Sequence, residues 1–320
     1  MPTLETLQTQ IQSIEDLQAV VRTMKALAMV SIHQYEKART SLADYNQTVE
    51  MGLQALLHHH HFSEAPFGLF PLASSAANNG LVGVIVLGSD HGLCGQFNEQ
   101  IVTYALEQLR HHQIRPDQCL LAAVGARLIP YLEMANQPIQ MQFSLPSSLA
   151  GATTLIQDLL LTIDQWHFQP DTPSAMPTPG EMTDLLPATV GRIFLFYNRS
   201  LSAMSYEPSI LQLLPLDRVW LHQLEQRPWT SSALPTLGLN WRSLLSALIR
   251  QHLFVALYRA TIESLSSENA GRLAAMQAAE KNIEERLADL HADYRQQRQN
   301  TITAELLDIV SGFEALEKMD

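Results

Sequence analysis

The distribution of proline constrains the fold of this 320-residue chain more than any other feature. Of its 16 prolines, only Pro2 lies outside residues 66–235, so residues 3–65 and 236–320 contain none. Proline breaks the interior of a helix because its ring removes a backbone donor and clashes with the preceding turn. Long uninterrupted helices are therefore possible only in these two arms, one near each end of the sequence.

Both arms carry an apolar residue at every third or fourth position, which predicts two amphipathic helices. In the N-terminal arm the mean spacing is about 3.5 residues, the value of a coiled coil rather than of a straight helix. The first stripe comprises Leu4, Leu7, Ile11, Ile14, Leu17, Val21, Met24, Ala28, Ile32, Tyr35, Ala38, Leu42, Tyr45, Val49, Leu53 and Leu56. The second comprises Leu273, Met276, Ala279, Ile283, Leu287, Leu290, Tyr294, Ile302, Leu306, Ile309, Phe313 and Leu316, with polar Arg298 as its one interruption.

The length of the C-terminal arm suggests how the two helices pair. A helix of about 75 residues would extend about 110 Å, farther than any domain that this chain could build. It would project from the globular part, and its apolar stripe would need a partner. One such stripe alone is typical of an ordinary helix packed on a core. Two stripes at opposite ends of one chain favour an antiparallel coiled coil instead.

The central part of the chain has the pattern of an α/β domain. Its buried strands are predicted at 81–88, 119–125 and 192–198, with a weaker one at 137–145, and its helices at 99–111, 126–134 and 148–165. Alternation of strand and helix is typical of a parallel, Rossmann-like sheet. The predicted fold class is thus α/β, with a long antiparallel coiled coil of the N- and C-terminal helices. Its predicted parts are an N-terminal coiled-coil helix at 1–62, a Rossmann-like domain at 66–235 and a C-terminal coiled-coil helix at 236–320.

Composition excludes several classes of function. The formal net charge of −12 argues against nucleic acid as a partner. No apolar run reaches the 18 or so residues needed to span a bilayer, so we expect no direct membrane insertion. Two cysteines are too few for a disulfide framework, which suits a reducing compartment.

The stretch "LGSDHGLCGQFN" at 87–98 follows a predicted strand and precedes a predicted helix. Its glycines, Gly88, Gly92 and Gly95, match neither the dinucleotide fingerprint nor the phosphate loop. We therefore interpret them as a structural turn between strand and helix. Cys94, with His91 nearby, could serve as a nucleophile, but inert packing of a buried cysteine is the favoured interpretation.

Nothing else in the sequence has the pattern of an active site. The histidine run at 58–61 lacks the spacing of metal ligands on a helix, and the carboxylates form no acid–base pair. We expect no catalytic residue, no metal and no cofactor. On the residues alone, the chain is a non-catalytic protein with a projecting helical pair, and a nucleotide-binding α/β enzyme with helical extensions or a coiled-coil scaffold are the alternatives.

Several blocks in order along the chain resemble the gamma subunit of F-type ATP synthases. "GSDHGLCGQFN" is similar to that family's S-T-D-R-G-L-C-G-x-x-N stretch, and "SSENAGRLAAMQAAEKN" (266–282) to its A-S-E-x-A-A-R-M-x-A-M-x-x-A-x-x-N stretch. "YRQQRQNTITAELLDIVSG" (294–312) resembles the C-terminal signature R-Q-x-x-I-T-x-E-x-x-[DE]-I-V-x-G. The stretch at 20–38 matches an N-terminal block of the family more loosely.

The resemblance implies a central rotor shaft that couples ion flow through the membrane c ring to ATP synthesis or hydrolysis in the beta subunits. The coiled coil would lie inside the ring of alternating alpha and beta subunits. The Rossmann-like domain would lie on the c ring beside the epsilon subunit. The shaft would bind no nucleotide or other cofactor and would be no enzyme by itself. It would be peripheral, on the cytoplasmic side of a bacterial inner membrane.

The same resemblance implies roles for single residues. Arg298, Gln299, Thr303 and Glu305 align with positions that contact a beta-subunit loop, and Met24 aligns with a methionine that faces the beta subunits. Packing in the seam between the helices is the open alternative for Met24. Gly271 replaces a usual alanine and would cost its helix about 1 kcal/mol. This change and the acidic charge suggest a divergent, second-type bacterial form.

Overall fold

The structure, a computed structural model, describes residues 3–59, 80–146, 148–167, 190–202, 204–229, 235, 238 and 240–317, with side chains up to residue 311. Its contacts divide the chain into two units. The helical unit consists of Met1–Met29 and Arg272–Asp320, and the sheet unit consists of Val30–Gly271. Positions 62, 66 and 236, where the predicted division of the chain falls, lie outside the described residues, so that division stays a prediction.

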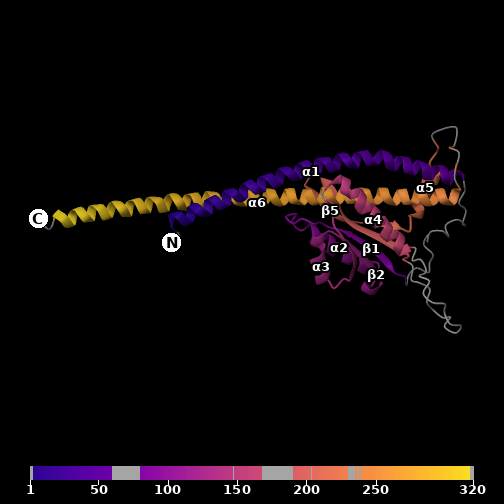
Figure 1. The fold of residues 1–320 in the computed structure, drawn as a ribbon, viewed down its shortest axis with the longest axis horizontal. Helices are drawn as coiled ribbons and strands as arrows, with labels where there is room; N and C mark the ends of the chain where they lie inside the picture. The colour runs from indigo at the N-terminus through magenta and orange to yellow at the C-terminus, as the bar shows by residue number, and fades with distance from the viewer. Residues whose placement is uncertain are drawn as a thin grey trace. The chain divides into compact units, whose positions relative to one another are not determined.

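The two proline-free arms are helical, as predicted. Helix α1 spans Leu4–His59 and α6 spans Trp241–Glu317, and Figure 1 shows both. A side-chain cap precedes α6, because the Asn240 Oδ1 atom accepts a hydrogen bond of 3.0 Å from the backbone N–H of Arg242. Each helix contributes to both units.

The sheet unit contains a five-stranded sheet in the order β3-β2-β1-β4-β5. The first four strands are parallel, and β5 runs antiparallel to β4. The strands span Val82–Leu87 (β1), Cys119–Val124 (β2), Ile139–Phe143 (β3), Arg192–Ser202 (β4) and Ser205–Leu214 (β5). The four predicted strands are thereby confirmed.

Strand β5 and the short helix α5, Arg218–Gln226, are missing from the sequence prediction. Pro208 lies within β5 and argues against a central strand. It is tolerated because β5 is an edge strand whose one neighbour is β4. The sheet is consequently mixed rather than purely parallel, with an antiparallel edge strand added to the Rossmann-like core.

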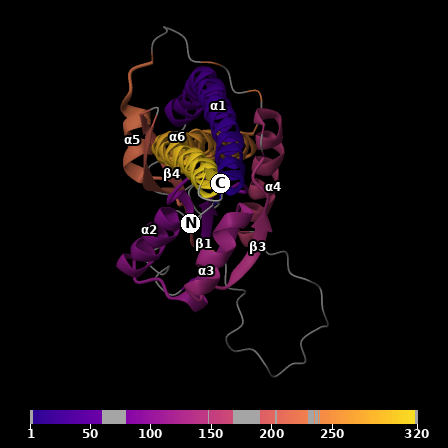
Figure 2. The same ribbon diagram turned by 90° about the vertical axis from the view of Figure 1, so that its left-hand side faces the viewer.

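Both faces of the sheet are covered by helices, which explains why its central strands are continuous apolar runs. Helices α2 (Phe97–His111) and α3 (Ile129–Met134) cover one face, the latter preceded by a 3-10 turn at Ala126–Leu128. The other face packs against α4 (Leu149–His167), α5 and the parts of α1 and α6 that belong to the sheet unit (Figure 2). On the first face lie Val82, Val84, Val86, Leu121, Ala123, Phe194 and Phe196, and on the second lie Ile85, Leu87, Ala122, Val124, Ile193 and Leu195.

Helix α6 is buried on all sides between residues 260 and 271, in the sheet unit. Every residue from 260 to 271 is buried, and the hydroxyl of Ser267 donates a hydrogen bond of 2.9 Å to the carbonyl of Asn198 at the end of β4. A Cβ atom at Gly271 would lie 2.8 Å from the carbonyl oxygen of Cys94 and 3.0 Å from the ring of Tyr206. Gly271 therefore lets the loop after β1 approach the helix backbone closely, which offsets its low helix propensity.

We expect Gly271→Ala to destabilise the chain although alanine is the better helix former. The gain in propensity is about 1 kcal/mol, but the new methyl group overlaps a backbone carbonyl and an aromatic ring, and such overpacking costs about 1–3 kcal/mol. The control is Gly52→Ala in α1, whose Cβ atom would meet a movable methyl group of Leu248 at 3.0 Å. Urea unfolding should show lower stability for the first variant and unchanged or higher stability for the second; a more stable Gly271→Ala protein would contradict this account.

Candidate functional site

In the helical unit, α1 and α6 pack against each other through apolar side chains, and this contact surface is called the seam. One cluster joins Leu7 and Ile11 of α1 to Leu290 of α6. A second cluster joins Val21 to Met276 and Ile283. Higher residue numbers on α1 thus meet lower numbers on α6, so the two helices run antiparallel. Further seam contacts come from Ile14, Met24, Ala275, Ala279, Leu287 and Tyr294.

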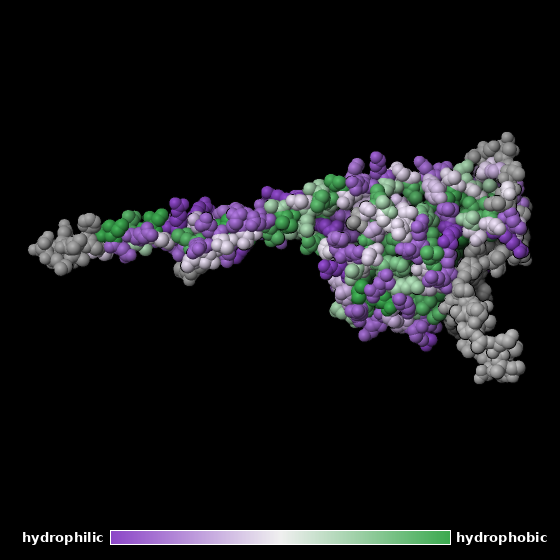
Figure 3. Space-filling model, viewed as in Figure 1, coloured by the Kyte–Doolittle hydropathy of each residue, from purple (hydrophilic) through white to green (hydrophobic). Residues whose placement is uncertain are grey.

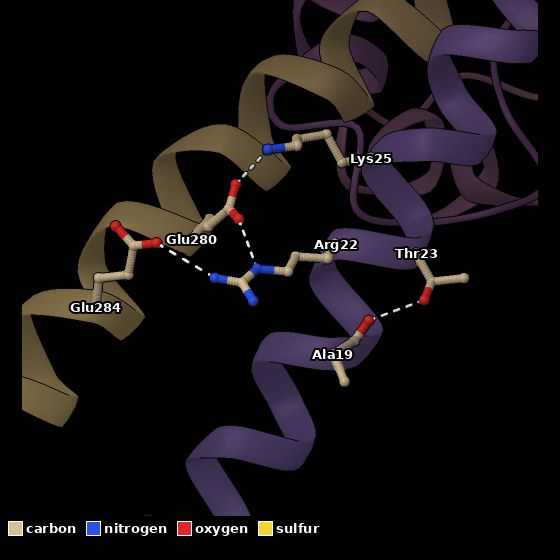
Figure 4. A network of polar contacts seen from close by, with 6 residues as sticks. All are labelled: Ala19, Arg22, Thr23, Lys25, Glu280 and Glu284. Carbon is tan, nitrogen blue, oxygen red and sulfur yellow. Dashed lines mark hydrogen bonds and ion pairs between the residues drawn. The ribbon is translucent and has the colours of Figure 1, made fainter.

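A charged clamp crosses this seam beside the second cluster. Figure 4 shows Arg22 and Lys25 of α1 reaching to Glu280 and Glu284 of α6. Arg22 Nε lies 3.0 Å from Glu280 Oε1, and Arg22 Nη2 lies 3.6 Å from Glu284 Oε1. The ammonium of Lys25 pairs with Glu280 Oε2, so both carboxylate oxygens of Glu280 are engaged. Hydrogen bonds from Lys25 and then Arg22 lower the pKa of Glu280 below its ordinary value of 4.5.

The clamp is absent from the sequence prediction. Its signal is present: Arg22 and Lys25 are three residues apart on α1, and Glu280 and Glu284 are four apart on α6. Opposite charges flank the two apolar stripes at matching positions. The match becomes visible only once the antiparallel register is known, and the sequence does not give that register.

Met24 lies half-buried in the seam cluster that contains Val21 and Met276. The structure therefore gives it a packing role, and a contact with beta subunits stays a prediction. Leu17, which the apolar stripe places in the seam, is 51% exposed, while its neighbour Gln18 is half-buried. The position between Ile14 and Val21 that faces α6 is thus residue 18, and the stripe prediction is wrong at Leu17.

Arg298, Gln299, Thr303 and Glu305 all lie exposed on α6. The hydroxyl of Thr303 donates a hydrogen bond of 2.9 Å to the carbonyl of Gln299 one turn earlier. Within the described part of the chain, neither Arg298 nor Glu305 has an ion-pair partner. These exposed side chains are available to another molecule.

Apolar side chains on the same part of α6 are also exposed. The stripe was predicted to continue in the seam, but α1 begins at Leu4 and the last buried seam residue on α6 is Leu290. Among the described residues, Tyr294 is the last on α6 to share an apolar cluster with α1, and Ile302, Leu306 and Ile309 are exposed, so the prediction is wrong for this stretch. Figure 3 shows the resulting hydrophobic surface near the C-terminal end. It consists of Ile302, Leu306, Leu307, Ile309 and Val310, each 48–61% exposed, and contiguous exposed apolar groups indicate a binding surface. The side chains of Phe313 and Leu316 lie outside the described ones.

The glycine turn at 87–98 lies in the sheet unit, between β1 and α2. A Cβ atom at Gly88 would lie 2.2 Å from Leu128, and Gly95 has a φ of +64°, so both positions require glycine. Gly92 has no such constraint, since its Cβ would meet no atom nearer than 4.0 Å.

Side chains of this turn bind the neighbouring loops. The Asp90 carboxylate accepts hydrogen bonds from the backbone N–H groups of Ala126 (2.7 Å) and Leu145 (2.9 Å). The Asn98 side chain bonds the backbone and the hydroxyl of Ser89 at 3.0 and 2.8 Å. Cys94 is buried. The turn thus ties together the loops that follow three parallel strands.

The carboxyl ends of β1 and β4 are where a doubly wound sheet has its ligand crevice, because the strand order reverses there. In this chain, α6 packs at that place. Ser267 bonds the carbonyl of Asn198, and the side-chain amide of Asn198 donates to the carbonyl of Phe97 at 3.3 Å. The ring of Tyr206 lies edge-on to Phe97, 5.4 Å between centroids. The edge of the sheet that commonly binds a nucleotide therefore holds a helix.

Other candidate chemistry has little support among the described residues. No group of three or more potential ligands lies close enough to hold a metal ion there. Nε2 of His58 and of His59 lies 3.2 and 2.9 Å from the carbonyls of Arg227 and Pro235, while His60 and His61 lie outside the described residues. No helix in the described ranges is both long and apolar enough to cross a membrane.

The relatives found by comparison with known proteins are chains of ATP synthases. A family model described as ATP synthase matches residues 3–316. The ATP synthase gamma chain of Anaeromyxobacter dehalogenans (strain 2CP-C) is 28% identical over 326 residues, which cover 99% of this chain and 100% of that relative. The ATP synthase gamma chain of Sulfurovum sp. (strain NBC37-1) is 26% identical over 323 residues, with the same coverage of both chains.

Solved structures with a similar fold come from ATP synthase rotors. A chain of the Euglena gracilis mitochondrial ATP synthase rotor matches with a TM-score of 0.56 at 16% identity, over 93% of this chain and 98% of that one. A chain of the Tetrahymena thermophila mitochondrial ATP synthase central stalk and c ring matches with a TM-score of 0.52 at 18% identity, over 81% and 99%. At these identities the likeness concerns the fold.

The clamp predicts a pH dependence of stability. The pKa of Glu280 is lower in the folded chain, so the unfolded chain takes up this proton first as the pH falls. The clamp's contribution is fully present above the unfolded pKa near 4.5 and is lost as the pH drops through the folded pKa. Glu280→Gln removes the charge and should flatten the decline in unfolding free energy between about pH 6 and pH 3.

The matched control for this experiment is Glu284→Gln. Glu284 is 57% exposed, and its ion pair with Arg22 is long, at 3.6 Å, so its loss should leave the pH slope close to that of the unmodified chain. Equal slopes for Glu280→Gln and the unmodified chain would contradict the assignment of the clamp to Glu280.

Proposed function

The chain belongs to the ATP synthase family, in which its matching relatives are gamma chains, and on this premise we propose that α1 and α6 work as the central rotor shaft of an F-type ATP synthase. The observation that carries the proposal is the antiparallel pairing of helices from the two ends of the chain, together with the unpaired apolar surface of α6. The chain is a subunit of the complex and is not catalytic by itself.

A shaft of this kind works by differential contact. As it turns, each orientation presents different side chains to each of three catalytic beta subunits. A contact that is stronger in one conformation of a beta subunit shifts the population toward that conformation. No chemistry on the shaft is needed, because the free energy passes through contact surfaces alone.

The contact surface that we assign to the beta subunits begins at the exposed polar groups of α6. Arg298 and Glu305 offer charges with no ion-pair partner in the described residues, and Gln299 and Thr303 lie on the exposed surface between them. The adjoining apolar surface from Ile302 to Val310 is exposed to water, so its burial against another subunit would favour binding. On α1, three exposed apolar residues add to this contact surface beside Met24: Leu17, Val20 and Leu27.

Torque transmission requires that the helices neither slip nor separate. In the helical unit, the seam supplies apolar burial and the clamp at Glu280 opposes a slip in register. In the sheet unit, the buried stretch of α6 from 260 to 271 is fixed to β4 and to the glycine turn. The turn at Gly88, Gly92 and Gly95 thus has a mechanical role, as an anchor for the shaft.

The assembly that we propose has the coiled coil inside a hexameric ring of alternating alpha and beta subunits. The Rossmann-like part contacts the epsilon subunit and the membrane c ring. The complex would lie on the cytoplasmic side of a bacterial inner membrane, where ion flow through the c ring turns the shaft. The acidic charge of the chain is consistent with a second-type bacterial enzyme whose partner surfaces carry altered charge.

The assignment of the contact surface is tested by a double variant, Arg298→Ala with Glu305→Ala. Both side chains are exposed, so the fold should tolerate the change within about 0.5 kcal/mol. We expect the variant to assemble with alpha and beta subunits but to drive ATP synthesis several-fold more slowly in inverted membrane vesicles. The control is Lys281→Ala, an exposed residue of α6 whose contact with Glu285 lies within the helix. Unchanged synthesis by the double variant would remove the role assigned to these residues while leaving the fold and the family intact.

A further inference from the structure

A small cavity lies in the sheet unit, on the face of the sheet that α2 and α3 cover (Figure 2). Its volume is about 260 Å³, and its lining comes from the end of α2, the turn that leads into β2, and the residues that follow α3. Ligand sites commonly measure about 300–1,000 Å³, so a ligand of this cavity has to be small. The shaft function makes no use of the cavity.

The floor of the cavity is apolar and uncharged. Leu109, Ile114 and Cys119 line it, and all three are buried in the apolar cluster of this face of the sheet. Burial raises the pKa of the Cys119 thiol to about 12, so the thiol keeps its proton near pH 7. Such a floor favours the apolar body of a ligand, because the contact removes apolar surface from water.

The rim of the cavity carries positive charge. Arg110 and Arg115 both belong to the lining, and no aspartate or glutamate of the described ranges does. Arg115 is paired with Asp117 at 3.3 Å. Arg110 is exposed and has no ion-pair partner in the part of the chain that the structure describes. One guanidinium group at the rim is therefore available to an anion.

The carbonyl groups at the end of α2 oppose an anion only weakly, because they already accept hydrogen bonds. Gln113 has a φ of +57°, and its N–H group donates to the carbonyl of Arg110 at 3.0 Å. The next N–H group, that of Ile114, donates to the carbonyl of Leu109 at 2.9 Å. These bonds cap the helix. The charge that faces the cavity is thus that of arginine.

We propose that this cavity binds a small carboxylate with an apolar body, whose carboxylate pairs with Arg110 and whose body lies on the floor of Leu109, Ile114 and Cys119. A guanidinium group can donate two parallel hydrogen bonds to one carboxylate, which distinguishes a carboxylate from a neutral amide. The ligand would contact the end of α2 and the start of β2 together, so its binding would stabilise the sheet unit by mass action.

Calorimetric titration of the full chain at pH 7 with four probes tests this assignment. Benzoate has both the charge and the apolar body, benzamide lacks the charge, benzamidine carries the opposite charge, and acetate lacks the apolar body. We expect benzoate to bind one-to-one with a dissociation constant of about 1 mM, which is typical of so small a ligand. The other three probes should bind at least tenfold more weakly.

Three results would overturn the proposal. Benzamide or benzamidine binding as tightly as benzoate would show that the cavity does not recognise negative charge. Acetate binding as tightly as benzoate would remove the role of the floor. The absence of saturable benzoate binding up to about 10 mM, tenfold above the expected dissociation constant, would remove the site itself.

Two variants locate the bound probe. Arg110→Gln, at an exposed position, removes the charge and should weaken benzoate binding about tenfold. Ala135→Leu, at a half-buried lining position, should fill part of the cavity and weaken binding while Arg110 stays in place. The matched control is Arg127→Gln, an exposed arginine outside the lining, which should bind benzoate normally. Should Ala135→Leu fail to fold, Arg110→Gln still decides: unchanged benzoate binding by either folded variant would contradict the site.

Discussion

The pairing of α1 with α6 is the interaction on which the rest of this structure depends. Each helix carries a stripe of apolar residues at the coiled-coil spacing, and in the helical unit the two stripes bury each other. Complete burial of one leucine or isoleucine contributes about 1.5–3 kcal/mol, whereas exposed ion pairs in general contribute little. The seam is therefore the source of stability in the helical unit. The clamp around Glu280 has a different effect, because a slip along the helix axis would separate its charges.

In the sheet unit, part of α6 is surrounded by other elements instead of pairing with one helix. Between 260 and 271 it has no exposed face, and small or polar residues allow strands and loops to approach its backbone. Gly271 and Ser267 mark this approach, one through the missing side chain and one through a hydrogen bond to β4. The helix occupies the edge of the sheet where related folds bind nucleotides. The same α/β architecture thus holds a mechanical element instead of a ligand, which illustrates that fold alone does not determine function.

Much of this architecture could be predicted from the sequence, for identifiable reasons. Proline-free arms and a period near 3.5 residues report directly on helix continuity and pairing, and continuous apolar runs report on buried parallel strands. Strand β5 is not predictable in this way, because Pro208 and a half-buried pattern do not resemble a central strand. The apolar stripe on α6 extends past the part that pairs with α1, because sequence periodicity does not reveal where the partner helix begins. The clamp needed the antiparallel register, a tertiary property, before Glu280 could be matched with Arg22 and Lys25.

The central claim is that this chain turns as a shaft within its complex, and single-molecule rotation tests it most directly. Both native cysteines are buried, so Ser202→Cys, at an exposed position of β4, would offer one accessible thiol for attaching a bead. With alpha and beta subunits fixed to a surface and ATP supplied, the account predicts rotation of the bead in one direction, pausing at three positions per turn. Sustained ATP hydrolysis by the same complex with a stationary bead would contradict it.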